Sequence, residues 1–143
     1  MRSQKRTTFN LQQRFTHMRE RIYTPSAPNP IGPYSQAVKT NSFIYLSGQI
    51  PVDPQNGMLV EADIVLQTKQ VFANIAAVLE AAGSSFSKVV KTTVFLTDMN
   101  NFTGMNELYA SYFDQDDAPA RSTIQVSALP LGSLVEIEVI AEI

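Results

Sequence analysis

The order of strand-like and helix-like segments limits this chain to one class of fold. Apolar residues recur on one helical face between residues 63 and 82, with Asp63 suited to begin the helix and Gly83 to end it. Runs rich in β-branched and aromatic residues predict strands at 34–40, 43–48, 89–96, 121–128 and 134–142, and apolar spacing predicts a second helix at 101–114. The order β-β-α-β-α-β-β predicts an α+β fold with both helices on one face of a mixed sheet.

The 143 residues divide into a short basic segment and one domain. Residues 1–21 hold six basic residues and one acidic residue, whereas residues 22–143 hold five basic and twelve acidic residues. The first segment lacks the apolar run of a secretory signal. Four origins fit its composition: a helical extension, a tag, upstream sequence before a true start at Met18, or a mitochondrial transit peptide. A cytoplasmic location is expected unless the last of these holds.

The composition removes most familiar catalytic chemistry. Cysteine is absent, which excludes disulfides, thiolate metal sites, iron–sulfur clusters and a cysteine nucleophile. Histidine occurs once, at His17, so a Ser-His-Asp triad or a histidine-rich metal site has only that residue available. The sequence has no P-loop and no GxGxxG motif. What remains is chemistry built from carboxylate, arginine, hydroxyl and backbone groups, in a chain without credible metal ligands.

The charge of the domain bears on its partners. Its acidic balance argues against nucleic acid, because phosphate binding needs clustered Lys and Arg side chains. Only 17 of the 122 residues in 22–143 are charged, which is fewer than in a typical soluble domain. Such a surface is typical of one that partner subunits partly cover. No apolar run is long enough to form a membrane-spanning helix.

Two of the expected strands carry charged residues within an apolar pattern. Alternation in 134–142 puts Glu136 and Glu138 on one face, and alternation in 121–128 puts Arg121 and Thr123 on one face. If the two strands lie close together, Arg121 comes near Glu136. Two interpretations then stand. The pair is a surface ion pair worth about 0–1 kcal/mol, or it is a site in which Arg121 holds a carboxylate and Glu136 handles a proton or a water molecule.

Several motifs resemble the RidA/YjgF family of imine deaminases. They are IleGlyProTyrSerGln at 31–36, SerGlyGlnIlePro at 47–51, ValLysThrThrValPheLeu at 90–96 and ProAlaArgSerThr at 119–123, followed by GluIleGlu at 136–138. Their spacing also fits, and the resemblance covers about residues 20–143. It implies a chorismate-mutase-like (bacillus-type) α+β fold, assembled as a homotrimer around a central barrel, with active sites between subunits.

The resemblance also implies a reaction. Family members hydrolyse reactive enamines and imines, such as 2-aminoacrylate and 2-iminopropanoate, to 2-keto acids and ammonia without a cofactor, in a role of metabolite damage control. The chain is therefore expected to be a 2-iminobutanoate/2-iminopropanoate deaminase. Two alternatives stay open: a trimer that binds keto acids without turnover, and an RNA-binding or ribonuclease-like translation inhibitor, as some relatives are described.

The residues expected to carry the reaction follow from the motif matches. Arg121 matches the family arginine that holds the substrate carboxylate through two parallel hydrogen bonds, a geometry that lysine does not supply. Glu136 matches the glutamate that positions the attacking water or moves its proton. Glu138 is expected to be a structural or surface acid. Tyr34 matches a tyrosine whose hydroxyl orients the substrate or the water.

The other matches are expected to bind substrate. Ser47 matches a hydroxyl near the amine end, and Gly48 permits close approach of the backbone. Asn106 matches an asparagine on the second helix. Thr123 stands where certain bacterial relatives carry cysteine. Its hydroxyl can still serve the pocket, but regulation through a thiol is not expected.

Overall fold

The protein is built on one mixed sheet, seen in a computed structural model that describes residues 18–143. Six strands lie in the order β1-β2-β3-β8-β6-β7, and all neighbours run antiparallel except β6 and β7. Their bounds are β1 (Glu20–Ile22), β2 (Ala37–Lys39), β3 (Phe43–Gln49), β6 (Val89–Leu96), β7 (Ala120–Gln125) and β8 (Val135–Glu142). A separate hairpin joins β4 (Val52–Asp53) to β5 (Met58–Leu59).

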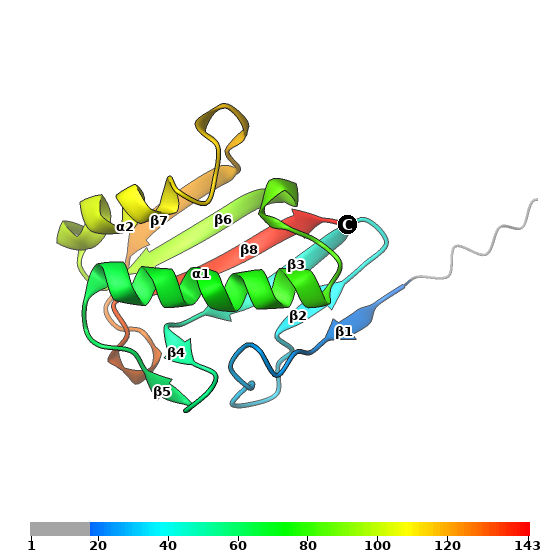
Figure 1. Cartoon of the computed structure of the whole chain (residues 1–143), viewed down its shortest axis with the longest axis horizontal. Helices are drawn as coiled ribbons and strands as arrows, with labels where there is room; N and C mark the ends of the chain where they lie inside the picture. Colours follow the sequence, from blue (N-terminus) through cyan, green and yellow to red (C-terminus); the bar gives the residue numbers. More distant parts are fainter. Residues whose placement is uncertain (1–17) are drawn as a thin grey trace, which may run out of the picture.

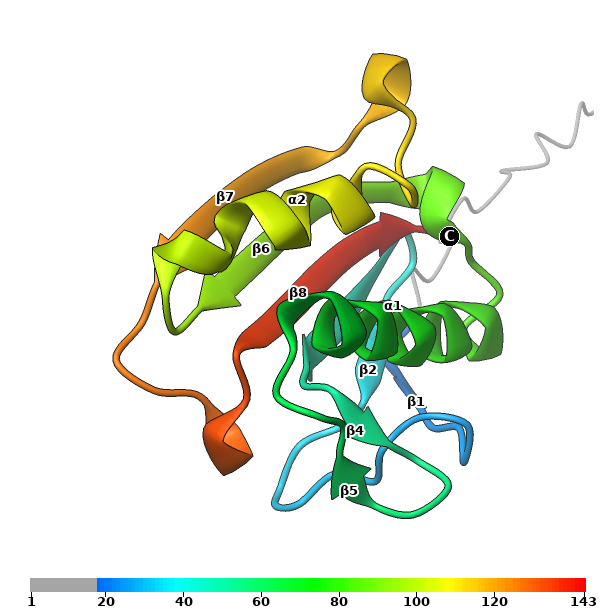
Figure 2. The same cartoon turned by 60° about the vertical axis from the view of Figure 1, so that its left-hand side comes forward.

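Two helices cover one face of this sheet. Helix α1 (Ile64–Ala81) begins after Asp63, whose carboxylate accepts a hydrogen bond from the backbone N–H of Leu66 at 2.9 Å. Helix α2 (Phe102–Tyr109) lies beside it, over β6 and β7. Figures 1 and 2 show both helices on the same side, so the opposite face of the sheet carries no helix of residues 18–143. None of the helices in that range combines the length and apolar character needed to cross a membrane.

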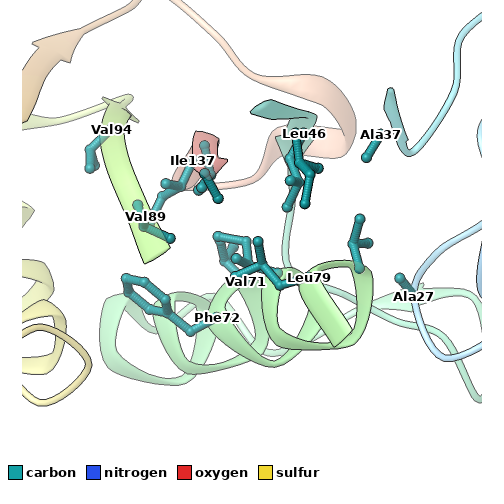
Figure 3. Packing of buried hydrophobic residues seen from close by; sticks show 14 of the residues in the cluster. Ala27, Ala37, Leu46, Val71, Phe72, Leu79, Val89, Val94 and Ile137 are labelled. Atoms are coloured by element: carbon teal, nitrogen blue, oxygen red, sulfur yellow. The ribbon is translucent and has the colours of Figure 1, made fainter. Parts of the chain in front are cut away.

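The hydrophobic core lies between α1 and the central strands. Alternate residues of β8 point toward the helices and are buried: Val135, Ile137, Val139 and Ala141. Val71, Phe72 and Leu79 of α1 pack against this face of the sheet (Figure 3). Each side chain of this size stabilises the fold by about 1.5–3 kcal/mol when fully buried.

An aromatic cluster around Phe72 fixes α2 against α1. The ring of Tyr112 stacks on Phe72 with centroids 4.1 Å apart, and Tyr109 and Phe113 meet its edge at 5.8 and 6.0 Å. Such pairs add about 0.5–1.5 kcal/mol beyond the area that they bury. This cluster fixes where α2 lies over the sheet, and therefore what its polar residues can reach.

The predicted α+β fold, with both helices on one face of a mixed sheet, is confirmed, but four boundaries differ. The strand expected at 121–128 covers Ala120–Gln125. The strand expected at 34–40 covers only Ala37–Lys39, and the side chain of Gln36, just before it, binds backbone atoms of residues 24–28. The helix expected at 101–114 ends at Tyr109, because Ser111 bonds back to the carbonyl oxygen of Leu108 and the chain turns. The sheet already begins at Glu20, inside the segment 1–21 expected as an extension. The helical extension expected there falls largely on residues 1–17, outside the described residues.

Candidate active site

Four of the residues predicted for the site line one cavity of about 520 Å³, where β3 ends and β8 begins. They are Tyr34, Ser47, Gly48 and Glu136. The rest of the wall is apolar and comes from loops: Ile31, Ile50, Pro130 and Leu131. The cavity therefore combines one ionisable carboxyl group and two hydroxyl groups with hydrocarbon walls.

Gly48 lies directly against the carboxyl group of Glu136. Strand β3 advances three residues from Leu46 to Gln49, while β8 advances only two from Val139 to Ile137, so β3 carries a bulge at this point. A methyl group on Gly48 would overlap Oε1 of Glu136. The close backbone approach expected at Gly48 is thus an approach to this carboxyl group, and position 48 has no room for a side chain while Glu136 stays in place.

The pKa of Glu136 is raised above the ordinary value for a glutamate. Burial is the main cause, because it disfavours the charged form, and the negative charge of Glu138 adds to it. Glu138 lies two residues further along β8, on the same face, and is exposed. A carboxyl group with a raised pKa takes up and releases a proton closer to neutral pH, which suits a general acid or base.

The two hydroxyl groups of the cavity are held by backbone contacts. Ser47 donates its hydroxyl proton to the carbonyl oxygen of Ser35, and its own N–H bonds to the carbonyl oxygen of Gln36 at 3.0 Å. The Tyr34 hydroxyl oxygen accepts a hydrogen bond from the N–H of Ile31 at 3.2 Å. Because that oxygen acts as an acceptor here, the phenolic proton is left to donate to a molecule in the cavity.

Arg121 lies apart from this cavity. It belongs to β7, and its guanidinium group packs against α2. One terminal N–H donates to Oδ1 of Asn106 at 2.8 Å. The guanidinium carbon sits 4.5 Å from the ring centroid of Tyr109 and 5.7 Å from that of Phe102. Arg121, Asn106 and Tyr109 line a second cavity of about 640 Å³. The positive charge is thus held by a cation–π contact and one hydrogen bond, with further donors left for an anion.

Tyr109 is itself fixed from below by the sheet. Its hydroxyl and that of Thr92, in the middle of β6, lie 2.7 Å apart, and both side chains are buried. Burial is the main cause that raises the pKa of Tyr109, so the phenol keeps its proton and its ring stays neutral. These two residues were not among the predicted site residues. The three-residue spacing of Asn106 and Tyr109 was a partial signal, because it places both on one helix face.

Arg121 and Glu136 do not meet within one chain. Strand β6 lies between β7 and β8, so two strand spacings of together about 9–10 Å separate them across the sheet. They also lie on opposite faces, because Arg121 contacts α2 whereas Glu136 alternates with Val135 and Ile137, which face the helices. The expectation that neighbouring strands bring the two residues together is therefore wrong for a single chain.

Thr123 belongs to the Arg121 side. It lies two residues further along β7, and its Oγ1 is buried without a hydrogen-bond partner among residues 18–143. The predicted site residues thus form two separate groups, one around Glu136 and one around Arg121.

Among residues 18–143, no group of three His, Cys, Asp or Glu side chains is arranged to hold a metal ion.

Comparison with known proteins places the chain in a family. The family model described as Endoribonuclease L-PSP matches residues 24–143. The chain is 52% identical over 124 residues to the 2-iminobutanoate/2-iminopropanoate deaminase of Mus musculus, covering 87% of this chain and 91% of that protein. The solved structure of the Rid family protein YyfA from Yersinia pestis is 55% identical, with a TM-score of 0.86, and the match covers 88% of this chain and 100% of that one.

A second solved structure adds a bound small molecule. TdcF of E. coli, solved with bound serine, is 44% identical with a TM-score of 0.81, covering 87% of this chain and 98% of that one. Both structures match the described sheet and helices over nearly their whole length. From these matches, the chain belongs to the Endoribonuclease L-PSP family, which is the RidA family that its motifs resemble.

Proposed function

We propose that the chain hydrolyses 2-imino acids and their enamine tautomers to 2-keto acids and ammonia, at sites formed where two subunits meet. The observation that carries this proposal is the division of the site between two faces of one sheet. A group suited to hold a carboxylate and a group suited to move a proton act on one small molecule only if a second copy supplies one of them. A 2-imino acid offers both targets on adjacent atoms, a carboxylate and a C=N carbon.

The relatives support this reaction. The proteins of Mus musculus and Homo sapiens that share 52% and 49% identity with the chain are both named 2-iminobutanoate/2-iminopropanoate deaminase. The serine bound in TdcF is a small molecule with a carboxylate and an amine on one carbon, close in size to a 2-imino acid. Identity near 50% over almost the full length of these relatives makes the same reaction the first hypothesis for this chain.

The open face of the sheet supports an assembly. Tyr45 of β3 and Ile124 of β7 lie on this face and expose 46% and 45% of their surface, because both helices cover the other face of the sheet. Apolar side chains on an uncovered sheet face, in a domain with few charges, are typical of subunit contacts. The assembly we propose is the homotrimer of the chorismate-mutase-like fold, in which Arg121 of one subunit meets Glu136 of the next.

Substrate binding would rest on Arg121. One N–H of the guanidinium is engaged by Asn106 and one face is covered by Tyr109, so an edge with two parallel donors remains for the substrate carboxylate. Two parallel hydrogen bonds fix both the distance and the orientation of the C=N carbon relative to Glu136. Thr123 lies on the same face of β7, but its hydroxyl oxygen is buried, so we assign it to the support of this group and not to direct contact with the substrate.

Hydrolysis would rest on Glu136. Its carboxylate takes a proton from water while the water oxygen bonds to the imine carbon, and it passes this proton to the nitrogen, which gives the carbinolamine. Glu136 then takes the hydroxyl proton of the carbinolamine as the C=O bond forms and the C–N bond breaks, and it gives that proton to the nitrogen, which leaves as ammonia. An enamine first gains a proton at its β-carbon and loses one from its nitrogen to become the imine. Tyr34 and Ser47 line the same cavity and would orient the water and the nitrogen.

The proposal is tested by coupling an amino-acid oxidase, as the source of imine, to the protein, while semicarbazide traps free imine. We expect wild type to lower semicarbazone formation and Arg121→Ala and Glu136→Ala to lose this effect. Lys69→Ala and Glu80→Ala, which change exposed charges on α1, are the matched controls and should behave as wild type. Full activity of Arg121→Ala would exclude the proposed carboxylate site, and an inactive wild type would favour keto-acid binding without turnover.

The division of the site has its own test. When the two inactive variants are unfolded together and refolded as mixed trimers, about one quarter of the sites combine an intact Arg121 with an intact Glu136 from different subunits. Activity should therefore return in the mixture and in neither variant alone. A mixture that stays inactive, although mass spectrometry shows mixed trimers, would place both residues of each site in one subunit and contradict the proposal.

The family description also raises a ribonuclease-like function. Among residues 18–143 we find no observation that favours it. The domain is acidic, and the one histidine of the sequence, His17, precedes this range. Deleting residues 1–17 separates the two functions. If RNA binding were lost while deamination stayed intact, RNA binding would belong to the basic segment.

A further inference from the structure

A smaller hollow, distinct from the cavity of Arg121, opens beside the cavity that holds Glu136. It has a volume of about 230 Å³, and the two share the side chains of Ile31, Tyr34, Ile50 and Leu131 as walls. Gly48, which touches the carboxyl group of Glu136, also lines both. A molecule whose reacting carbon sits at Glu136 can therefore extend a substituent into this hollow.

The hollow offers mainly hydrocarbon to such a substituent. No Asp, Glu, Lys or Arg lines it. Three of its polar side chains, Asn29, Gln36 and Gln49, already make hydrogen bonds within the chain, and the fourth, Tyr34, also lines the cavity of Glu136. Gln36 accepts from the N–H of Thr24 at 2.7 Å and donates to the carbonyl oxygen of Pro28 at 2.9 Å, and Asn29 accepts from the hydroxyl of Tyr23 at 2.9 Å. A charged substituent would lose water there without meeting a charged partner.

Two aliphatic side chains at the mouth are unusually exposed. Ile31 exposes 84% of its surface and Leu131 exposes 63%. Leu131 also has a backbone φ of 59°, in the left-handed region that disfavours residues with a side chain. A glycine or asparagine would relieve that strain, so a leucine held at this position indicates a use for its side chain.

Buried amides hold three of the segments that form the hollow. Gln36 ties down residues 24–28 through hydrogen bonds to their backbone. Asn74 of α1 donates to the carbonyl oxygens of Ile50 and Val52 at 3.1 and 2.9 Å. Gln67 of α1 accepts from the N–H of Leu134 at 2.8 Å, just after the turn that carries Leu131. All three amide side chains are buried, which keeps the shape of the hollow fixed before a ligand arrives.

We infer that this hollow is the subsite for the hydrocarbon side chain of the imino acid, and that Ile31 and Leu131 set a preference for aliphatic chains longer than methyl. The inference rests on the proposed deaminase function and adds which substrates the chain prefers. Removing hydrocarbon around the terminal methylenes should weaken turnover of a longer imine more than that of a shorter one.

The test compares imines made by an amino-acid oxidase from norvaline and from alanine, which differ only in chain length. The measured quantity is the protein concentration that halves semicarbazone formation. Wild type should need less protein for the norvaline-derived imine. Ile31→Ala and Leu131→Asn should lower this preference by about tenfold, because they should raise the concentration needed for the norvaline-derived imine more than that needed for the alanine-derived imine. Leu66→Ala, which shortens a similarly exposed side chain outside both cavities, is the control and should keep the preference.

A preference that both variants retain would overturn the inference. It would also be overturned if light scattering showed that either variant fails to assemble, because Ile31 and Leu131 would then serve subunit contact. Calorimetry with 2-oxopentanoate and pyruvate separates it from the proposed function. If wild type turns over neither imine but binds 2-oxopentanoate more tightly, and the variants lose that difference, the subsite stands and the deaminase function fails.

Discussion

The two halves of the candidate site hold their charged groups in opposite ways. Around Glu136, burial and the second carboxylate of Glu138 both disfavour the charge, and a glycine at position 48 makes room for the carboxyl group. Around Arg121, the ring of Tyr109 and the amide of Asn106 both stabilise the charge. The contrast fits the two roles, because a proton-transferring group needs a shifted pKa, whereas a carboxylate-binding group needs a fixed geometry.

The halves also differ in what builds them. The Glu136 half consists of a bulged strand and three loops, which buried amides hold in place. The Arg121 half consists of a helix and a strand that aromatic packing joins. Substitutions should therefore act on the first half through clashes and proton affinity, and on the second half through weaker support for the guanidinium.

The largest effect is expected at Gly48. In Gly48→Ala the new methyl group overlaps the Glu136 carboxyl group, which must move away from the substrate. We expect deaminase activity in the oxidase-coupled assay to fall by about 100-fold, as for other displaced catalytic groups. The unfolding free energy should fall only slightly, by at most about 1 kcal/mol, because the group that must move is the end of a flexible, half-buried side chain beside a cavity.

The double variant Gly48→Ala/Glu136→Ala is the control for this explanation. It removes the group that the methyl overlaps, so chemical denaturation should show that it recovers most of the stability that Gly48→Ala loses, while it remains inactive. If the two substitutions were simply additive in unfolding free energy, the overlap with Glu136 would not be the cause.

A smaller effect is expected at Tyr109. Tyr109→Leu removes the ring beneath Arg121, and the cation–π interaction between that ring and the guanidinium is worth about 0.5–2 kcal/mol. We therefore expect KM for the imine to rise by about 2- to 30-fold, with a smaller change in kcat, because Tyr109 is a positioning residue.

Tyr109→Phe separates this role from simple packing. It keeps the ring but leaves the hydroxyl of Thr92 without its partner, which should cost about 1–3 kcal/mol in unfolding free energy. KM should stay close to that of wild type. A KM as high as that of Tyr109→Leu would show that the hydroxyl contact with Thr92, and not the ring face, positions Arg121.

The smallest effect is expected at Glu138. Its negative charge helps to raise the pKa of Glu136, so Glu138→Gln should lower that pKa toward the ordinary value. Since the base form of Glu136 starts the reaction, the acidic limb of the profile of kcat/KM against pH should move to lower pH. Glu142→Gln, further along the same strand, is the matched control and should leave the limb unchanged. A limb that does not move in Glu138→Gln would mean that another group titrates there.

Much of the fold could be predicted from the sequence because its signals are local. The helix that begins after Asp63 shows in the apolar spacing and the cap, and the alternation in 134–142 puts Glu136 and Val135 on opposite faces. Helix α2 is shorter than its apolar spacing indicates, because Tyr112 and Phe113 pack in the aromatic cluster from a turn and not from a helix. Periodicity alone does not distinguish these two ways of burying a ring.

The arrangement of the candidate site could not be predicted from the sequence. Motif matches selected Arg121 and Glu136, yet nothing local in the sequence indicates that β6 lies between their strands. Tyr109 and Thr92 were missed for the same reason, because their contact joins a helix to a strand seventeen residues away. Such contacts depend on how the elements pack and not on the residues beside them.

The sequence by itself determined the kinds of element, the face on which each strand residue lies, and the carboxylate and arginine chemistry that remains when cysteine is absent and histidine occurs once. Those properties follow from backbone geometry and composition, which act over a few residues. Only the tertiary structure decided that Arg121 and Glu136 lie on opposite faces, that Gly48 touches a carboxyl group, and that Leu131 borders an apolar hollow. Strand order and loop placement follow from burying one shared core, which depends on the whole chain.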